Sequence, residues 1–251
     1  MTDAVRRKVK RSDLIADQIK DWIVKNDKKP GDRLPREHEL MALFAASKGT
    51  IREALKVLEV HGLIRITTGP AGGAVLMAVP YEQCLESVYS YLYFREISTG
   101  QVYALRKVLE PELAASLVNR VSEDEIEELL VLAKRSHPDE GGDWEARRNI
   151  ELAFHDRLAE LCPSPLLGMM CRLLNDVLRS MVLPKYARSH NVDLEETITD
   201  SHVALVRAIQ RADAKKARKI MAEHMSDVQH HGHALETPVK RNLTLQPNHT
   251  F

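Results

Sequence analysis

Apolar residues recur at helical spacing through the first sixty residues of the chain. Residues 12–27 show this period, and Ser12 is a suitable N-cap for the helix they predict. A second, short helix is expected to begin at Pro35, since proline is favoured in the first turn. A tight turn then leads to a third helix over residues 48–61, capped by Ser47. The pattern therefore predicts three consecutive helices.

The period then changes from helical to extended. Residues 63–67 and 74–77 are short β-like runs, and they flank a glycine-rich turn at residues 69–73. Two such runs around this kind of turn predict a β-hairpin. Three helices followed by a hairpin are the elements of a winged helix-turn-helix, which we expect over residues 1–78.

The rest of the chain shows only the helical period. We expect a linker at residues 79–84, an all-helical domain of six or seven helices at 85–231, and a flexible tail at 232–251. Ser122 and Asp213 are suitable N-caps, and Pro165 fits a helix start. The fold class is therefore mainly α. The predicted helices span residues 81–97, 100–120, 122–136, 143–162, 165–183, 194–211 and 214–231.

Charge separates the two predicted domains although the whole chain of 251 residues has a net charge of zero. Residues 1–78 carry 15 Lys and Arg against 10 Asp and Glu, so the excess of acidic residues lies in the remainder. A basic segment joined to an acidic one suggests that the first part binds a polyanion. The three cysteines show no metal or redox spacing, and no apolar run is long enough to span a bilayer. These features predict a cytoplasmic protein without a membrane partner.

The predicted third helix has the side chains that a recognition helix needs. Its inner face carries Ile51 and Leu55, while short polar and basic residues remain on the outer surface. Arg52 suits a guanine edge or a phosphate, and Arg36 precedes it at the start of the second helix. A solvated surface would explain any one of these residues alone, but the set together predicts contact with double-stranded operator DNA. The outer polar residues include Ser47, Lys48, Thr50 and Arg52.

This segment resembles a known family. The stretch PGDRLPREHELMALFAASKGTIREALKVLEVHGLIRITTGPAGGAVL is similar to the winged helix of the GntR family of bacterial regulators. His38 and Lys48 stand where some members of that family carry arginine, so the resemblance leaves the operator sequence open. The resemblance implies that the DNA-contacting positions are Arg36, His38, Lys48, Thr50, Arg52 and Gly69.

Several histidines in the helical half have suggestive positions. Glu151 and His155 are four residues apart, so both lie on one helical face within reach of a single ion. His202 and His224 lie on two further predicted helices and could join them if those faces turn inward. Taken singly, each histidine could equally be a core or surface residue, and the Glu–His pair could be a plain helix-surface contact.

A second resemblance bears on these histidines. The segments LRKVLEPELAASLV, ELAFHDRLAEL and SHVALVRAIQRADAKKARKIMAEHM resemble the FCD ligand-binding domain, which defines the FadR-like branch of the GntR regulators. In its metal-binding members four positions hold a divalent ion, and these correspond to Glu151, His155, His202 and His224. The first ligand is usually Asp rather than Glu. Three imidazoles and a carboxylate suit Zn²⁺, with Ni²⁺ or Mn²⁺ as alternatives.

Arg106 is the residue expected to bind the effector. It lies in the segment that resembles the domain's R-x-x-L-E motif, and we expect it to pair with the second charged end of a small carboxylate. An internal salt bridge to Glu110, one turn away, is the alternative. The predicted protein is a homodimer on a palindromic operator, and by analogy with the family a ligand-responsive repressor rather than an enzyme.

Two other functions remain open from the sequence. In the first, the metal ion itself is the signal and there is no organic effector. In the second, the Glu and His set activates water in a metal-dependent hydrolase, and the winged helix is an accessory domain. His230, His231 and His233 near the C-terminus could bind metal adventitiously.

Overall fold

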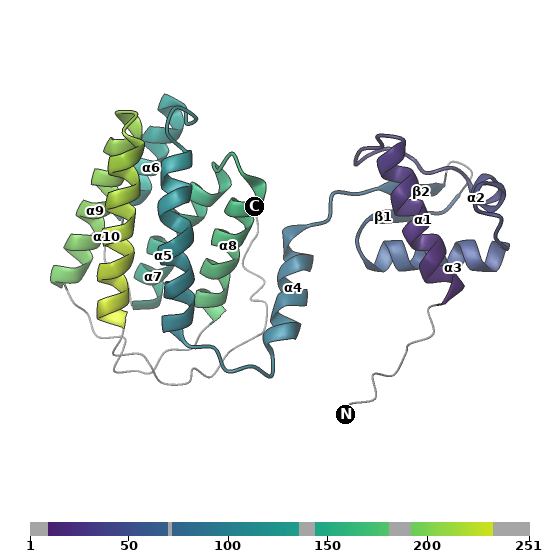
Figure 1. Cartoon of the computed structure of the whole chain (residues 1–251), viewed down its shortest axis with the longest axis horizontal. Helices are drawn as coiled ribbons and strands as arrows, with labels where there is room; N and C mark the ends of the chain where they lie inside the picture. Colours follow the sequence, from purple (N-terminus) through teal and green to yellow (C-terminus); the bar gives the residue numbers. More distant parts are fainter. Residues whose placement is uncertain (1–9, 70–71, 136–143, 181–191, 233–251) are drawn as a thin grey trace. The chain divides into compact units, whose positions relative to one another are not determined.

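A computed structural model of the chain describes residues 10–69, 72–135, 144–180 and 192–232. The chain forms two compact units, Met1–Val88 and Tyr89–Phe251, and each is described by itself (Figure 1). The predicted tail at 232–251 lies outside the described residues from 233 onward.

The described residues of the first unit up to Leu76 form three helices and a two-stranded antiparallel sheet, as the sequence predicts. Ile64 pairs with Leu76 at one end of the hairpin and Thr67 with Gly73 at the other. Helix α1 lies across α3 (Figure 1). The winged helix-turn-helix is therefore confirmed. Its elements are α1 (Arg11–Lys25), α2 (Glu37–Phe44), α3 (Lys48–Val60), β1 (Ile64–Thr67) and β2 (Gly73–Leu76).

Ser47 is the N-cap of α3, as predicted, and its hydroxyl accepts a hydrogen bond from the Thr50 backbone N–H at 3.3 Å. The predicted N-cap Ser12 is wrong, because α1 begins at Arg11 with Lys10 as its N-cap.

The second helix does not begin at Pro35 but at Glu37. The backbone N–H of Leu34 donates to the carbonyl of Ala74 at 2.9 Å, so this segment is held extended against β2. Arg36 is then the N-cap, and its backbone N–H donates to the Glu39 carboxylate at 2.6 Å. The pairing with β2, which the local sequence does not reveal, delays the start of the helix by two residues.

One apolar core holds the first unit together. It joins the inner faces of the three helices to the hairpin, and its most buried members include Ile19, Leu40, Ile51 and Leu58. Burying a side chain of this size stabilises the fold by about 1.5–3 kcal/mol. This core fixes α3 so that its opposite face is exposed.

The described part of the second unit contains helices and the loops between them but no strand, and it brings together segments far apart in sequence. Helices α5 and α10 lie side by side, as do α9 and α10, and α7 packs against α8 (Figure 1). The predicted caps Ser122 and Asp213 both form, since each side chain accepts from a backbone N–H three residues later. The helices are α4 (Tyr81–Leu92), α5 (Thr99–Ser116), α6 (Glu123–Arg135), α7 (Trp144–Glu160), α8 (Pro165–Ser180), α9 (Val192–Gln210) and α10 (Ala214–Gly232).

Helix α4 begins at Tyr81, where the predicted helix 81–97 begins, but departs from the prediction at its end. Residues 81–84, which also belong to the expected linker, are therefore helical, and the boundary between the two units falls within this helix, after Val88. It ends at Leu92 rather than at residue 97. In the last predicted turn, Tyr93 and Phe94 are 61% and 91% exposed, so burial of these two side chains does not extend the helix. No helix in the described parts of the chain is long and apolar enough to cross a membrane.

Candidate metal centre and DNA-reading surface

Three histidines and one glutamate meet inside the helical unit. Glu151 and His155 come from α7, His202 from α9 and His224 from α10, and one donor atom of each lies within 4.8 Å of the others. Nε2 of His224 lies 3.1 Å from Nε2 of His202 and 3.3 Å from Nε2 of His155. Oε1 of Glu151 lies 3.2 Å from Nε2 of His155. The four residues named from the sequence are therefore brought together.

Packing fixes these side chains. The three imidazoles are buried, with exposed fractions of 3% or less. The ring of Phe154 stacks on the ring of His202, with centroids 4.0 Å apart, and Phe154 is itself fully buried in the main core. The same apolar core that stabilises the unit thus orients a donor of the cluster.

The environment keeps two of the imidazoles neutral. Burial and the neighbouring His224 and His155 hold the pKa of His202 well below its usual range. Burial and the neighbouring His155 lower the pKa of His224 to about 3. Neutral imidazole is the form that binds a metal ion.

The carboxylate of the cluster is ionised. Burial alone would raise the pKa of Glu151, but its contacts with His155 and the charge of Arg106 lower it to about 2. A buried carboxylate beside two neutral imidazoles provides one negative charge and several lone pairs. These are the donors that a divalent cation requires.

The spacing of the donor atoms also fits such a cation. Ligands about 2.0–2.1 Å from a tetrahedral zinc ion lie about 3.3–3.4 Å from one another. The donor separations of 3.1 Å to 3.3 Å are close to that value. In addition, Oε1 of Glu151 is buried and has no hydrogen-bond partner in the described part of the chain. The residues present therefore fit a divalent metal ion.

Arg106 of α5 lies beside the four donors and is fully buried. Its Nε donates to the carboxylate of Glu110, and its Nη2 lies 3.9 Å from Oε1 of Glu151. Burial would lower the pKa of Arg106, but the charges of Glu110 and Glu151 raise it above its usual value. The internal salt bridge to Glu110 is thus formed. Even so, Nη1 and Nη2 have no hydrogen-bond partner among the described residues.

Two residues around the centre were not identified from the sequence as supports of the histidines. Oε2 of Glu110 lies 2.5 Å from Nδ1 of His155, and the hydroxyl of Ser201 lies 2.8 Å from Nδ1 of His224. Such partners on the second ring nitrogen orient a metal-binding imidazole. Glu110 was visible only as a partner of Arg106 at helical spacing. Its contact with His155 depends on how α5 packs against α7.

The residues predicted to contact DNA gather at the start of α2, on α3 and in the hairpin turn. Thr50 is half-buried, with its hydroxyl 2.9 Å from that of Ser47, so this pair closes the first turn of α3. Gly69 has a φ of 107°, a backbone conformation that favours glycine. The other predicted residues are exposed, namely Arg36, His38, Ser47, Lys48, Arg52 and Gly69.

Arg52 is held by a residue that the sequence did not single out. Its Nε donates to both carboxylate oxygens of Glu37, at 3.0 Å and 3.1 Å. Glu37 is the first residue of α2, so this ion pair joins the two helices of the helix-turn-helix.

Comparison with family models explains both halves of the chain. Residues 11–71 match the model described as "Bacterial regulatory proteins, gntR family", and residues 101–227 match the "FCD domain". The chain belongs to the GntR family of bacterial regulators. Both resemblances drawn from the sequence are thereby confirmed, and the chain is a DNA-binding transcriptional regulator with an FCD domain.

Named GntR regulators are similar over most of their length. LutR of Bacillus subtilis, a transcriptional regulator, is 25% identical over 82% of this chain and 94% of its own length. NanR of Escherichia coli K12, a transcriptional repressor, is 24% identical over 90% and 85%. A solved GntR structure from Streptococcus agalactiae has a TM-score of 0.63 at 18% identity, over 87% of this chain and 99% of that one. This last similarity supports the fold alone.

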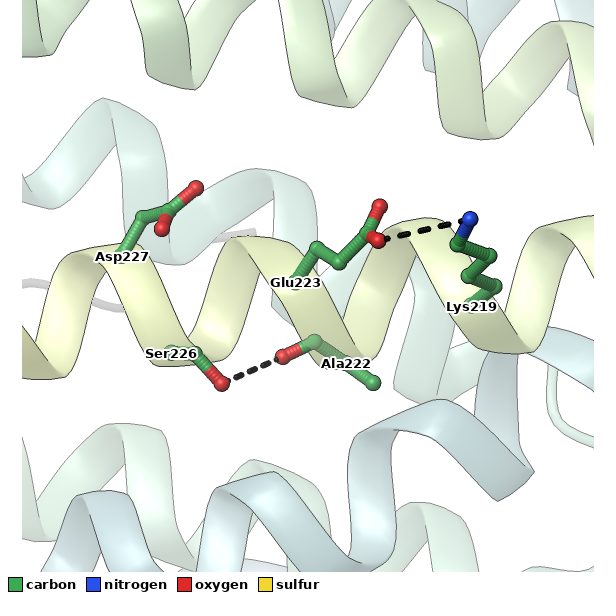
Figure 2. Close-up of a pocket in the computed structure, with 5 residues that line it drawn as sticks. All are labelled: Lys219, Ala222, Glu223, Ser226 and Asp227. Carbon is green, nitrogen blue, oxygen red and sulfur yellow. Dashed lines mark hydrogen bonds and ion pairs between the residues drawn. The ribbon is translucent and has the colours of Figure 1, made fainter.

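The GntR winged helix implies DNA as a partner, and the FCD domain implies a small-molecule effector. A surface pocket of about 540 Å³ lies on α10, but its lining contains none of the residues expected to bind metal or effector (Figure 2). Two of its side chains are an ion pair, with Nζ of Lys219 3.6 Å from Oε1 of Glu223. The side chains of His230, His231 and His233 lie outside the described residues.

Proposed function

We propose that this GntR regulator is a ligand-responsive repressor whose helical unit binds one divalent metal ion and a small carboxylate. The ion is Zn²⁺, with Ni²⁺ or Mn²⁺ as alternatives, and its ligands are Glu151, His155, His202 and His224. The convergence of these four donors carries the proposal, because three buried imidazoles, two of them held neutral, and an ionised carboxylate form a donor set that a single cation would satisfy. When bound, the ion supplies a site for an anionic effector group.

The unused nitrogens of Arg106 support a carboxylate as the effector. A buried guanidinium nitrogen without a partner is costly, and a carboxylate can accept from both terminal nitrogens at once. Since Nη2 lies 3.9 Å from Oε1 of Glu151, an anion that reaches Arg106 also lies beside the four donors. One carboxylate can therefore meet both, and a second charged end of the effector is not required.

On the DNA side, we assign contact with the operator to the exposed residues around α3. Arg52 and Lys48 lie on the outer face of the helix, while Ile51 and Leu55 on its inner face are buried. A basic outer face on a fixed helix suits the major groove. Two copies of the chain would read the two halves of a palindrome as a homodimer in the cytoplasm. The proposed contacts are Arg36, His38, Ser47, Lys48, Thr50, Arg52 and Gly69.

Thermal unfolding of the metal-loaded protein with a panel of sugar acids, hydroxy acids, dicarboxylates and fatty acids tests the effector. A carboxylate at a hundred times its Kd adds about 2.7 kcal/mol to the free energy of unfolding. The proposal expects at least one hit, which is lost in Arg106→Lys and in His202→Ala. It also expects that hit to change operator affinity, because an effector must bind two states unequally. A panel without hits contradicts the carboxylate assignment.

The same panel, read out by operator affinity, distinguishes this proposal from the alternative in which the metal ion is itself the signal. If metal alone changes operator affinity and no carboxylate adds to the effect, the ion is itself the signal. A metal-dependent hydrolase is disfavoured, since the matched domains and the named relatives are those of transcriptional regulators. Turnover of a small ester or carboxylate that is lost in His202→Ala would reverse that judgement.

A further inference from the structure

The ion pair between Glu37 and Arg52 leaves one end of the guanidinium available. Only Nε of Arg52 is used, since it donates to both oxygens of Glu37. The two terminal nitrogens of Arg52 have no hydrogen bond within the described residues. The side chain is 61% exposed while that of Glu37 is 38% exposed, so the unused end faces solvent on the outer side of α3.

From this geometry we infer that Glu37 is a positioning residue for DNA reading. Glu37 holds the guanidinium of Arg52 through Nε and leaves the two terminal nitrogens facing outward. These two nitrogens form a fork that matches a pair of acceptors on a guanine edge or a phosphate. A free arginine side chain would lose rotamer freedom on binding, and a held one has already lost it. This inference rests on the proposed contact between Arg52 and the operator.

The negative charge of Glu37 also affects how the protein binds DNA of any sequence. A carboxylate beside the recognition helix repels DNA phosphates, so Glu37 lowers the affinity for any duplex. A residue that both repels DNA in general and aligns one specific contact increases discrimination between sequences. Glu37 therefore raises the ratio of specific to non-specific affinity.

The test uses the full-length protein and two duplexes. One is selected by the wild-type protein from a randomised pool, and the other is a shuffled duplex of the same length and composition. Glu37→Gln should lower the ratio of the two affinities by about tenfold, with binding to the shuffled duplex unchanged or stronger. A misfolded variant would lose affinity for both duplexes, so the ratio separates positioning from loss of structure.

Glu53→Gln is the matched control. Glu53 is exposed on α3 next to Arg52, and its substitution removes the same charge without touching the ion pair. It should change binding to both duplexes by the same factor and leave the ratio unchanged. A Glu37→Gln ratio equal to that of Glu53→Gln would overturn the inference.

Arg52→Lys separates this inference from the role of Arg52 itself. Lysine keeps the charge but lacks the fork, so the ratio should fall, and adding Glu37→Gln should then change it no further. If Arg52→Lys discriminates like the wild type, the contact assigned to Arg52 fails. If Arg52→Lys loses discrimination but the two substitutions act additively, only the positioning role fails.

Modified duplexes identify the acceptor that the fork meets. Deazaguanine removes one acceptor of a guanine edge, whereas a methylphosphonate removes a phosphate charge. One such change in the selected duplex should weaken wild-type binding by a larger factor than it weakens binding of Glu37→Gln. Equal factors for the two proteins at every position would contradict the inference.

Discussion

Oε2 of Glu110 lies 2.5 Å from Nδ1 of His155, so helix α5 supplies the carboxylate that faces a histidine of α7. The same carboxylate accepts from Nε of Arg106. Burial alone would raise the pKa of Glu110, but the charges of Arg106 and His155 lower it to about 2. One ionised group thus contacts both a proposed metal ligand and the proposed effector-binding residue.

Glu110→Gln should therefore weaken both kinds of binding. The amide no longer pairs as a charge with Arg106 or with His155, so the affinity for Zn²⁺ should fall about 10- to 100-fold. Competition with a fluorescent chelator measures this affinity. Glu112→Gln is the control on the same helix, because Glu112 pairs with Arg218 at the surface and should leave Zn²⁺ affinity unchanged. Unchanged affinity in Glu110→Gln would contradict the orienting role.

Arg106→Lys should separate effector binding from metal binding. Lysine keeps the positive charge beside Glu110 but cannot present two terminal nitrogens to one carboxylate. Zn²⁺ affinity should stay within a few-fold of the wild type, while stabilisation by the effector should disappear in calorimetric unfolding. The control is Arg218→Lys on α10, where the pair with Glu112 is exposed. A variant that still responds to the effector would show that Arg106 has only a structural role.

The stability of the metal-free protein should fall as the pH drops below about 6.5. The unfolded chain protonates His202 and His224 near that pH, whereas the folded protein holds the pKa of His202 well below it and that of His224 at about 3. Stability is therefore lost progressively between pH 6.5 and about 3.

Other ionisable groups of the centre also shape the curve of folding stability against pH. The contribution of His155 to the pH dependence of stability has the opposite sign, because Glu110 raises its folded pKa against the effect of burial. Its stabilisation is complete below pH 6.5 and is lost as the pH rises through that folded pKa. Glu110 and Glu151 add to the acid loss only below about pH 4.5, down to about 2. Urea unfolding against pH measures the curve, and His224→Gln should flatten it between pH 6.5 and 4.5. A metal-free protein with constant stability over that range would exclude the buried neutral imidazoles.

The helical core supplies a test of the fold itself. Leu129 of α6 is fully buried in the main core, whereas Leu166 of α8 is 67% exposed. Leu129→Ala should lower the free energy of unfolding by about 2–5 kcal/mol, and Leu166→Ala by no more than about 0.5 kcal/mol. Chemical denaturation compares the two variants. Equal losses would mean that the packing of α6 is wrong.

Several helix starts could be predicted from local patterns in the sequence. Ser47, Ser122 and Asp213 cap the helices that follow them because capping depends on residues only three positions apart. The start of α2 could not be predicted in this way. Leu34 pairs with β2, which lies about forty residues further along the chain, and no local signal reports that pairing.

The metal centre shows the same division. The spacing of Glu151 and His155 places them on one helical face, and this follows from the sequence alone. That His202 and His224 join them came from the family resemblance, because convergence depends on how α7, α9 and α10 pack. The roles of Ser201 and Glu37 were missed, since a serine or glutamate at these positions has no distinguishing pattern until its partner is known.

Titration of metal-stripped protein with Zn²⁺ tests the central claim most directly. The account predicts one tight site per chain in a variant whose His230, His231 and His233 are replaced by glutamine. It also predicts that this site is lost when His224→Gln is added, with helicity retained in circular dichroism. A protein whose tight binding vanishes with the three C-terminal histidines, or survives His224→Gln, would contradict the metal centre proposed for this GntR regulator.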